Sequence, residues 1–294
     1  MISTGSQIIC LAPATDTHFS QAVFLQEILR EGQYESEDEG TELWDQQAWN
    51  ETRTHRFKAV VGDHEKFDQI LTWSAANTPL NLWVYGLENT RIWMENTTVR
   101  CREKQSQKTG EIIELEISMA ISKAGALITR RTNILDPTDA DGSVATEFTI
   151  TSASFGTVTP NASFTTAVGN ALRLTASTPG TLAKALNTKK IPAVRGMVFS
   201  VRANIYGSGG TTGVSHRIQL IGHDGTGAIT ETLSILTGSN GLAVLSGSLA
   251  VAHANTRYIR LELATYADTG TSVCEFDNIT LMHGPSVPTS FINN

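Results

Sequence analysis

The sequence has few of the features that mark the easily recognised protein classes. It contains three cysteines in 294 residues, Cys10, Cys101 and Cys274. An odd, widely spaced set forms neither a disulfide framework nor a zinc pattern, so we expect three small side chains in the core or at an interface. No run of 18 apolar residues is present, and the N-terminus has no basic segment before an apolar run. The sequence therefore predicts no membrane span and no secretion signal.

The motifs of common catalytic sites are also missing from the sequence. The seven histidines are scattered singly and form neither H-x-x-x-H nor H-E-x-x-H, and no G-x-S-x-G is found. The glycine-rich segment 207–213 lies between expected strands, so it opens no helix whose N-terminus holds a phosphate. The net charge of −7 disfavours general nucleic-acid binding, which needs a basic face. We expect a protein that is not an enzyme and does not bind nucleic acid specifically.

Tryptophan and charge divide the chain into two halves. All five tryptophans precede residue 94, and residues 1–143 hold 22 acidic and 13 basic residues, a net charge of −9. Residues 144–294 hold 7 acidic and 9 basic residues, a net charge of +2. Between them, the Asp136-Pro137 step and the aspartates that follow favour turns. We predict domains at 1–135 and 144–284, a linker at 136–143 and a C-terminal tail at 285–294.

The first half combines helix and strand patterns. Helical spacing of apolar residues predicts a helix over His18–Gly32, and the acidic run Glu35–Glu42 is expected to be a solvated loop. A second helix is predicted at 63–77, with Asp63 as its N-cap. Alternating patterns predict the flanking strands, at 54–62, 79–87, 90–105 and 110–122.

The stretch from His55 to Met119, with this strand–helix–strand order and closing hairpin, resembles the N-terminal domain of the distal tail proteins of tailed phages. It is also similar to the related tail-tube fold. The resemblance implies a β-sandwich with a flanking helix that assembles as a homo-oligomeric, hexameric ring, contacts other tail proteins and is located in the virion tail. The alternative is an ordinary two-layer α+β domain with no ring.

The second half is strand and turn almost throughout, with strands spaced as in a β-sandwich or jelly roll. The segments "GMVFSVRANIYGSG", "HRIQLIGHDGTG" and "NTRYIRLELATYADTGTSVCEFDNITLMHG" resemble the galactose-binding-like jelly roll of carbohydrate-binding modules, notably the xylan- and glucan-binding kind. The resemblance covers Phe148 to Gly284. Asp277 and Asn278 match that family's "DNV" or "DDV" pair, and the apolar pattern changes face at these two residues, which predicts a β-bulge or a bend.

The resemblance to sugar-binding modules directs attention to aromatic side chains, on which pyranose rings pack. The second half has no tryptophan. Tyr206 and Tyr266, at expected strand ends, are predicted to form a small carbohydrate platform with His216, His223 or Asp268. Alternatively, they are rim residues that cover the sandwich edge.

The same resemblance implies a structural calcium ion, with Glu147 and Asp277 as its carboxylate ligands. No other cofactor is expected.

The strand patterns predict a mainly β protein, and the resemblance to tail proteins implies a structural virion protein of a tailed phage or phage-like particle. It would form a ring in the tail tube or tail tip and display a jelly roll for decoration or adhesion to a host surface glycan. The alternatives are a free-standing carbohydrate-binding protein and a head-decoration or fibre-base protein.

Overall fold

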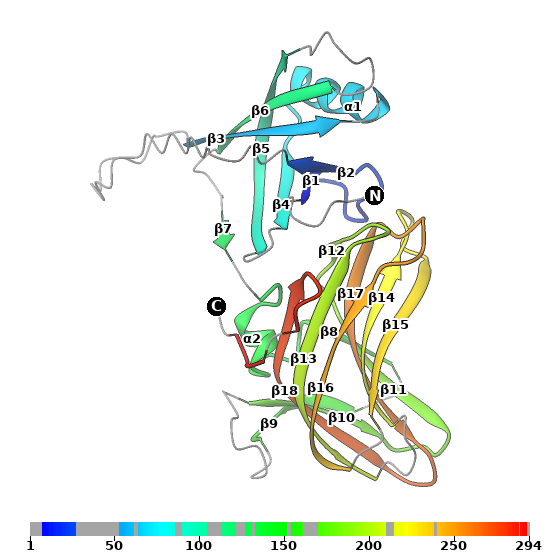
Figure 1. Cartoon of the computed structure of the whole chain (residues 1–294). Helices are drawn as coiled ribbons and strands as arrows, with labels where there is room; N and C mark the ends of the chain where they lie inside the picture. The colour runs from blue at the N-terminus through cyan, green and yellow to red at the C-terminus, as the bar shows by residue number, and fades with distance from the viewer. Residues whose placement is uncertain are drawn as a thin grey trace, which may run out of the picture. The chain divides into compact units, whose positions relative to one another are not determined.

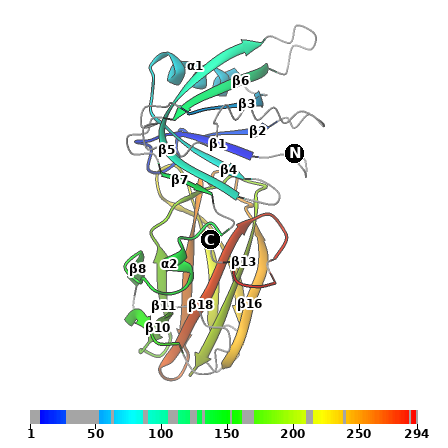
Figure 2. The same cartoon turned by 90° about the vertical axis from the view of Figure 1, so that its left-hand side faces the viewer.

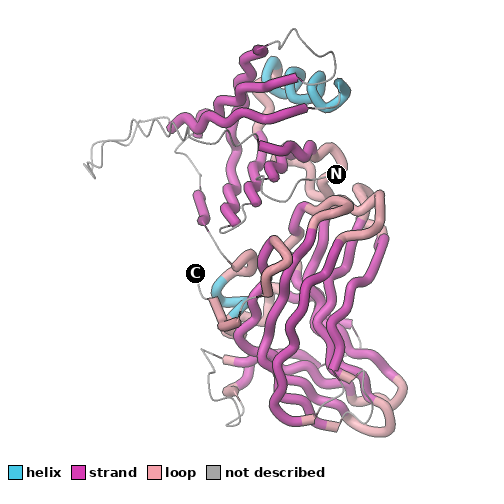
Figure 3. Tube along the Cα trace, in the orientation of Figure 1, coloured by secondary structure: helices cyan, strands magenta, loops and turns pink. Residues whose placement is uncertain are grey.

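The chain folds into two compact units that are built mainly of β-strands (Figure 3). The computed structural model describes residues 8–27, 53–61, 64–85, 90–104, 113–121, 127–130, 133–151, 154–160, 170–209, 215–237, 240–287 and 289–292. Unit 1 comprises Met1–Thr17 and Gln21–Arg130, and unit 2 comprises His18–Ser20 and Arg131–Asn294. The boundary therefore falls at Arg130–Arg131, before the predicted linker at 136–143.

Unit 1 is an antiparallel sheet with one described helix. Its elements are β1 (Ile8–Pro13), β2 (Val23–Glu27), β3 (Arg53–Val61), α1 (His64–Ala75), β4 (Leu80–Tyr85), β5 (Thr90–Lys104), β6 (Ile113–Ile121) and β7 (Leu127–Arg130). The strand order is β4-β1-β2-β3-β6-β5-β7, and a further pairing of β4 with β5 closes the sheet on itself. The helix and the four strands predicted between residues 54 and 122 are confirmed.

The predicted helix over His18–Gly32 is wrong where the structure describes it. Residues 23–27 form β2, which pairs with β1 and β3. Val23 and Leu25 are buried while Phe24 is half-buried, which is the period of two of a strand. The segment is a strand because it pairs with β1, although its apolar residues also fit a helical spacing. Residues 28–32 and the acidic run Glu35–Glu42 lie outside the described residues.

Unit 2 is the expected antiparallel β-sandwich (Figures 1 and 2). Its elements are α2 (Pro137–Ala140), β8 (Phe148–Thr151), β9 (Ser154–Val158), β10 (Ala171–Ala176), β11 (Thr181–Asn187), β12 (Ile191–Pro192), β13 (Val198–Ser208), β14 (His216–His223), β15 (Ile229–Thr237), β16 (Gly241–Ala250), β17 (Tyr258–Ala267) and β18 (Ser272–His283). One sheet has the order β16-β13-β18-β10-β9. The other has the order β15-β14-β17-β11-β8, with β12 paired to β17.

The core of unit 2 lies between the two sheets, where the inward-pointing side chains of their strands meet. Ile218 of β14 and Leu261 of β17 are fully buried from one sheet, and Ile205 of β13 and Phe276 of β18 from the other. The residues that alternate with these buried ones along each strand therefore point to the two outer faces of the sandwich.

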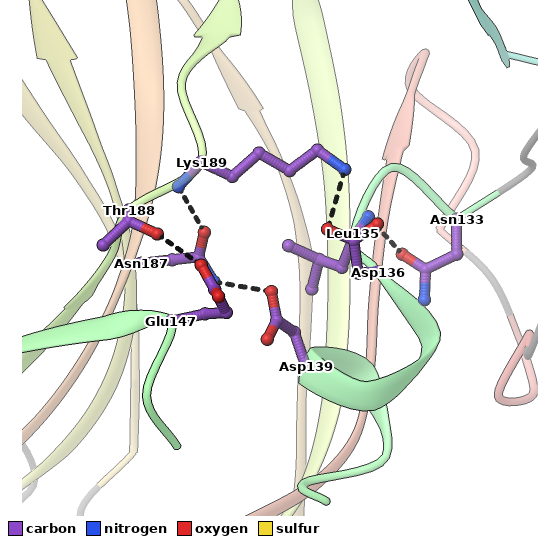
Figure 4. A network of polar contacts seen from close by, with 8 residues as sticks. All are labelled: Asn133, Leu135, Asp136, Asp139, Glu147, Asn187, Thr188 and Lys189. Atoms are coloured by element: carbon purple, nitrogen blue, oxygen red, sulfur yellow. Dashed lines mark hydrogen bonds and ion pairs between the residues drawn. The ribbon is translucent and has the colours of Figure 1, made fainter. Parts of the chain in front are cut away.

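The segment that was predicted to be a linker is part of the sandwich instead (Figure 4). Asp139 of α2 is 1% exposed and accepts a hydrogen bond from Asn187 Nδ2 at 3.1 Å. Lys189 Nζ lies 3.4 Å from Asp136 Oδ2. These contacts attach α2 to the end of β11 and explain why a turn-forming sequence is ordered here.

Asn133 attaches the same segment to the other sheet. Its Nδ2 donates to the carbonyl oxygens of Ile279, at 2.9 Å, and Ile292, at 3.1 Å. Its Oδ1 accepts from the backbone N–H groups of Leu281, at 3.0 Å, and Leu135, at 3.2 Å. The predicted C-terminal tail is thus held to the sandwich at Ile292.

Among the described residues, α1 and α2 fall short of the length and hydrophobicity that a membrane-spanning helix needs. Cys10 and Cys274 are buried free thiols, as predicted, and burial raises the pKa of both.

Candidate functional site

One outer face of unit 2 carries a row of side chains in cross-strand register. Tyr206 of β13 pairs with Leu242 of β16 on one side and with Glu275 of β18 on the other. Glu275 in turn pairs with Arg173 of β10. Directly opposed residues of antiparallel strands point to the same face, with Cβ atoms about 5 Å apart. Because Ile205 points into the core, this row points outward.

An ion pair fixes the polar end of the row. Arg173 Nε donates to Glu275 Oε1 at 3.1 Å, and Arg173 Nη2 contacts the same oxygen. The Glu275 side chain is only 3% exposed, whereas that of Arg173 is 44% exposed. A carboxylate this buried is stable only when it is paired, so the pair holds the guanidinium at the surface of the sheet.

The other end of the row is apolar and accessible. Tyr206 is half-buried, and Leu242 and Val244 on the outer side of β16 are 49% and 52% exposed. Val244 pairs with Asn204, which lies one row along the same face as Tyr206. The face therefore joins an aromatic ring and exposed aliphatic groups to a fixed pair of charges.

A β-bulge on β18 sets which residues reach this face. Arg202 of β13 pairs with Thr280, but Asn204 pairs with Asp277, so β18 carries one extra residue in this interval. Asn278 has a φ of 55°, the left-handed conformation that a bulge requires and asparagine tolerates. The bulge that the sequence predicted at Asp277–Asn278 is confirmed.

The bulge keeps apolar residues on both of its sides in the core. Phe276 and Ile279, three positions apart, are both fully buried. Asp277 is fully buried on the outer side, and its Oδ1 accepts a hydrogen bond from the Asn278 N–H at 2.7 Å. Asp277 thus caps the break in the strand ladder.

The structure does not bring the two predicted platform tyrosines together. Tyr266 lies on β17, in the six-stranded sheet, where it pairs with Leu182 of β11. Its neighbour Thr265 is fully buried, so Tyr266 points to the outer face opposite that of Tyr206. Asp268 directly follows β17. Of the predicted carbohydrate-binding residues, Tyr206 is the one beside the Arg173–Glu275 pair.

His216, also predicted at the platform, lies inside the sandwich. It is fully buried, and its Nδ1 is 3.0 Å from Thr265 Oγ1. Thr265 Oγ1 is in turn 2.9 Å from Ser272 Oγ. Burial lowers the pKa of His216, and a hydrogen bond with Asn240 opposes this change. A ligand on either outer face does not meet this ring.

His223 is held at the far end of β14. Its ring stacks on Tyr258 at a centroid distance of 4.8 Å and an interplanar angle of 6°. Its Nδ1 lies 3.0 Å from the carbonyl oxygen of Gly227, and burial lowers its pKa. This packing explains the histidine without a ligand.

The two carboxylates predicted to bind calcium belong to different parts of the sandwich. Glu147 leads into β8 of the six-stranded sheet, and its Oε2 accepts a hydrogen bond from Thr188 Oγ1 at 2.9 Å (Figure 4). Asp277 lies on β18 of the five-stranded sheet and caps the bulge. The described residues contain no group of three or more His, Cys, Asp or Glu side chains arranged for a metal. A calcium ion held by Glu147 and Asp277 stays a prediction from the sequence.

Arg173 was missed by the sequence reasoning. It is an isolated basic residue in the short strand "ALRLTA", and nothing in that strand marks it. It becomes part of the site only through the pairing of β10 with β18, which joins residues 102 positions apart in sequence.

No known protein family matches the sequence, and no curated protein matches it. Solved structures with some likeness include the enzymatically active domain of tailspike protein 4 of bacteriophage CBA120, at 10% identity and a TM-score of 0.41. That match covers 52% of this chain and 22% of the tailspike chain. The CBM22-1 xylan-binding domain from Paenibacillus barcinonensis is 10% identical, with a TM-score of 0.35, and the match covers 48% of this chain and 87% of that one.

A third structure is the carbohydrate-binding module TmCBM61 in complex with β-1,4-galactotriose. It is 13% identical, with a TM-score of 0.35, and the match covers 52% of this chain and 99% of that one. At such identities and scores, what these proteins bind says nothing about the ligand of this chain.

Proposed function

We propose that unit 2 binds a carbohydrate chain on the outer face of the five-stranded sheet. The observation that carries this proposal is the register of Tyr206 with the Arg173–Glu275 pair on one exposed face. We call the surface formed by Leu242, Tyr206, Glu275 and Arg173 the tyrosine face.

The tyrosine face offers both kinds of contact that a sugar needs. A pyranose ring has an apolar C–H face, which packs on the Tyr206 ring and the neighbouring Leu242 side chain. Its hydroxyl groups accept hydrogen bonds from the Arg173 guanidinium, whose side chain is 44% exposed. Because the ion pair holds the guanidinium in place, little side-chain entropy is lost when the sugar binds.

A single ring on one tyrosine gives weak binding. One ring packed on one side chain buries little apolar area, and each buried CH₂ group contributes only about 0.8 kcal/mol. Useful affinity therefore depends on several copies acting on one polymer or one surface. This requirement fits the sequence-based prediction that the chain forms homo-oligomers.

The two tyrosines provide a matched test of the site. In affinity electrophoresis, a polysaccharide that the protein binds slows its migration through the gel. For a polysaccharide that slows the wild type, Tyr206→Ala is expected to weaken binding about tenfold, which corresponds to about 1.4 kcal/mol. Tyr266→Ala removes another half-buried tyrosine, from the other sheet, and should bind as the wild type does. Two results would contradict the proposal. One is an equal loss of affinity in both variants, and the other is a wild type that no polysaccharide in a broad neutral panel slows.

The role of the whole chain in a particle is a further part of the proposal. A hexameric ring formed by unit 1, contacts with tail proteins, a location in the virion tail and a bound calcium ion all remain predictions from the sequence. Light scattering on the purified chain tests the ring directly. A mass near 31.7 kDa at micromolar concentration is that of one chain and would contradict the ring. The alternative of a free-standing carbohydrate-binding protein would then be favoured.

A further inference from the structure

One edge of the five-stranded sheet in unit 2 is a long strand that has a partner on one side. This strand, β16, pairs with β13 over ten consecutive residues without a register shift. It is the last strand of its sheet, so its outer edge pairs with no other strand of the described residues. The backbone N–H and C=O groups of an edge strand can hydrogen-bond to a further strand.

β16 has none of the features that normally prevent an edge strand from pairing. Such features are short length, charged side chains, proline and bulges. Residues 232–256 contain no Asp, Glu, Lys or Arg, although charged residues make up 17% of the chain. The other edge strands described in unit 2 differ, because β8 and β9 have four and five residues and β15 contains Glu231 and a register shift. A partner strand therefore meets the least obstruction at β16.

The core is also incompletely covered along β16. Phe199 of β13 is fully buried, but its partner Leu249 on β16 is half-buried. On the outer face of the same strand, Leu242 and Val244 are 49% and 52% exposed. Both faces of β16 thus carry apolar surface, and a neighbouring strand that removes it from water gains free energy.

We infer that β16 pairs antiparallel with β16 of a second copy of this chain, about a two-fold axis. Two strands of ten residues match over their full length, about 34 Å at the usual rise per residue. Such a pair makes about ten inter-strand hydrogen bonds, the number found in a typical protein–protein interface. Because β16 has no charged residue, two chains that each carry a net charge of −7 meet here without like charges on opposite strands.

A second β16 fits this edge better than other strands do. β8 and β9, with four and five residues, cover at most half of its length. A flexible peptide from another protein loses conformational entropy when it becomes extended, whereas β16 of a second copy is already a strand. A two-fold pair also closes after two copies and so cannot continue into a fibre.

The two-fold axis keeps the outer faces of both five-stranded sheets on one side. Three strand spacings, about 14 Å, separate the Tyr206 positions of the two copies across the sheet. The pair therefore presents two tyrosine faces to one polymer, which supplies the multivalency that weak single-site binding needs. This consequence rests on the proposed function, whereas the pairing itself does not.

The test is sedimentation velocity on the full chain from about 1 to 100 μM, a range that covers micromolar dissociation constants. The wild type should show a concentration-dependent doubling of mass. Ser246→Lys puts a charge at an exposed position in the middle of β16, where pairing brings it close to the same charge of the second copy. We expect it to raise the dissociation constant by about tenfold or more. Any association through unit 1 persists in this variant, so the comparison isolates β16.

The control variants separate pairing through β16 from a general effect of charge. Ser154→Lys makes the same change on β9, the opposite edge of the same sheet, and should associate as the wild type does. Ser246→Asp alone should associate weakly, because it also places like charges near each other. An equimolar mixture of Ser246→Lys and Ser246→Asp should recover the doubled mass, since opposite charges then meet. Thermal melting checks that each variant folds.

Three results would overturn the inference. They are a wild-type mass that does not rise with concentration, equal weakening by Ser246→Lys and Ser154→Lys, and no recovery in the mixture of the two Ser246 variants. The sugar test is independent of these, because Tyr206→Ala should associate as the wild type does. If Tyr206→Ala binds polysaccharide as the wild type does while the Ser246 variants behave as expected, the proposed function is lost and the pairing stands.

Discussion

The imidazole of His216 lies directly against Gly207 of the opposite sheet. A Cβ atom built on Gly207 would be 2.1 Å from His216 Nε2, far inside any allowed contact. Because Gly207 has no side chain, the histidine ring can fill the space between the sheets at this point of β13. In such a close-packed interior, the neighbouring atoms have little room to move when a methyl group is added.

Gly207→Ala is expected to destabilise unit 2 by about 1–3 kcal/mol, the usual cost of overpacking a core. Equilibrium unfolding in urea measures the change. Gly156→Ala, on β9 of the same sheet, is the matched control, because no atom lies within 4 Å of its Cβ position. The double variant Gly207→Ala/His216→Ala should lose less than the sum of the two single changes. An additive result would show that the two residues do not compete for space.

Stability should also depend on pH through His216. Burial lowers the folded-state pKa of His216 below its ordinary value of 6.5, so the unfolded chain binds a proton more readily. Its contribution is therefore fully present above pH 6.5 and is lost as the pH falls from there through the folded pKa. Urea unfolding at pH 7.5 and 5.5 should show a smaller loss in His216→Gln than in the wild type. His223, whose pKa is also lowered, accounts for a remaining slope. Identical losses in the two proteins would contradict this assignment.

The bulge on β18 predicts opposite responses to two substitutions at Asn278. Its φ of 55° costs a glycine nothing and costs a β-branched residue about 1–3 kcal/mol. We expect Asn278→Gly to unfold near the wild-type urea midpoint and Asn278→Val to unfold at a clearly lower one. Thermal melting provides an independent readout. Equal effects of the two changes would mean that side-chain contacts, not backbone conformation, decide this position.

Asn133 should be among the most sensitive polar positions in unit 2. Asn133 is 1% exposed, and its side-chain amide makes four hydrogen bonds to the backbone, which Asn133→Leu removes without replacing. Unmet buried backbone groups cost about 1–3 kcal/mol each, so a loss of several kcal/mol is expected. Asn255→Leu, at an exposed turn position, should change stability by about 0.5 kcal/mol or less. A wild-type melting curve for Asn133→Leu would show that the segment before α2 is dispensable.

Local sequence pattern was sufficient for several parts of this structure. The helix α1 and strands β3 to β6 follow from apolar periodicity, which reports burial within one element. The Asp277–Asn278 bulge was predicted because the apolar residues change face there, and only an extra residue keeps Phe276 and Ile279 in one core. The two-sheet sandwich follows from many short strands separated by turns.

The tertiary structure alone decided what these elements bring together. The segment before residue 27 has helical spacing, yet pairing with β1 makes it a strand, because long-range packing outweighs a weak local preference. Asn133 and Asp139 lie in a sequence of turn formers, and only their partners on the two sheets make it part of the sandwich.

The sequence by itself determined that residues 144–284 form a β-sandwich with Tyr206 and Tyr266 on its strands. Which side of the sandwich each tyrosine faces, and that Arg173 and Glu275 stand beside Tyr206, was decided by strand pairing. That pairing depends on contacts between residues far apart in sequence, and a shift of one residue would turn each side chain to the other face.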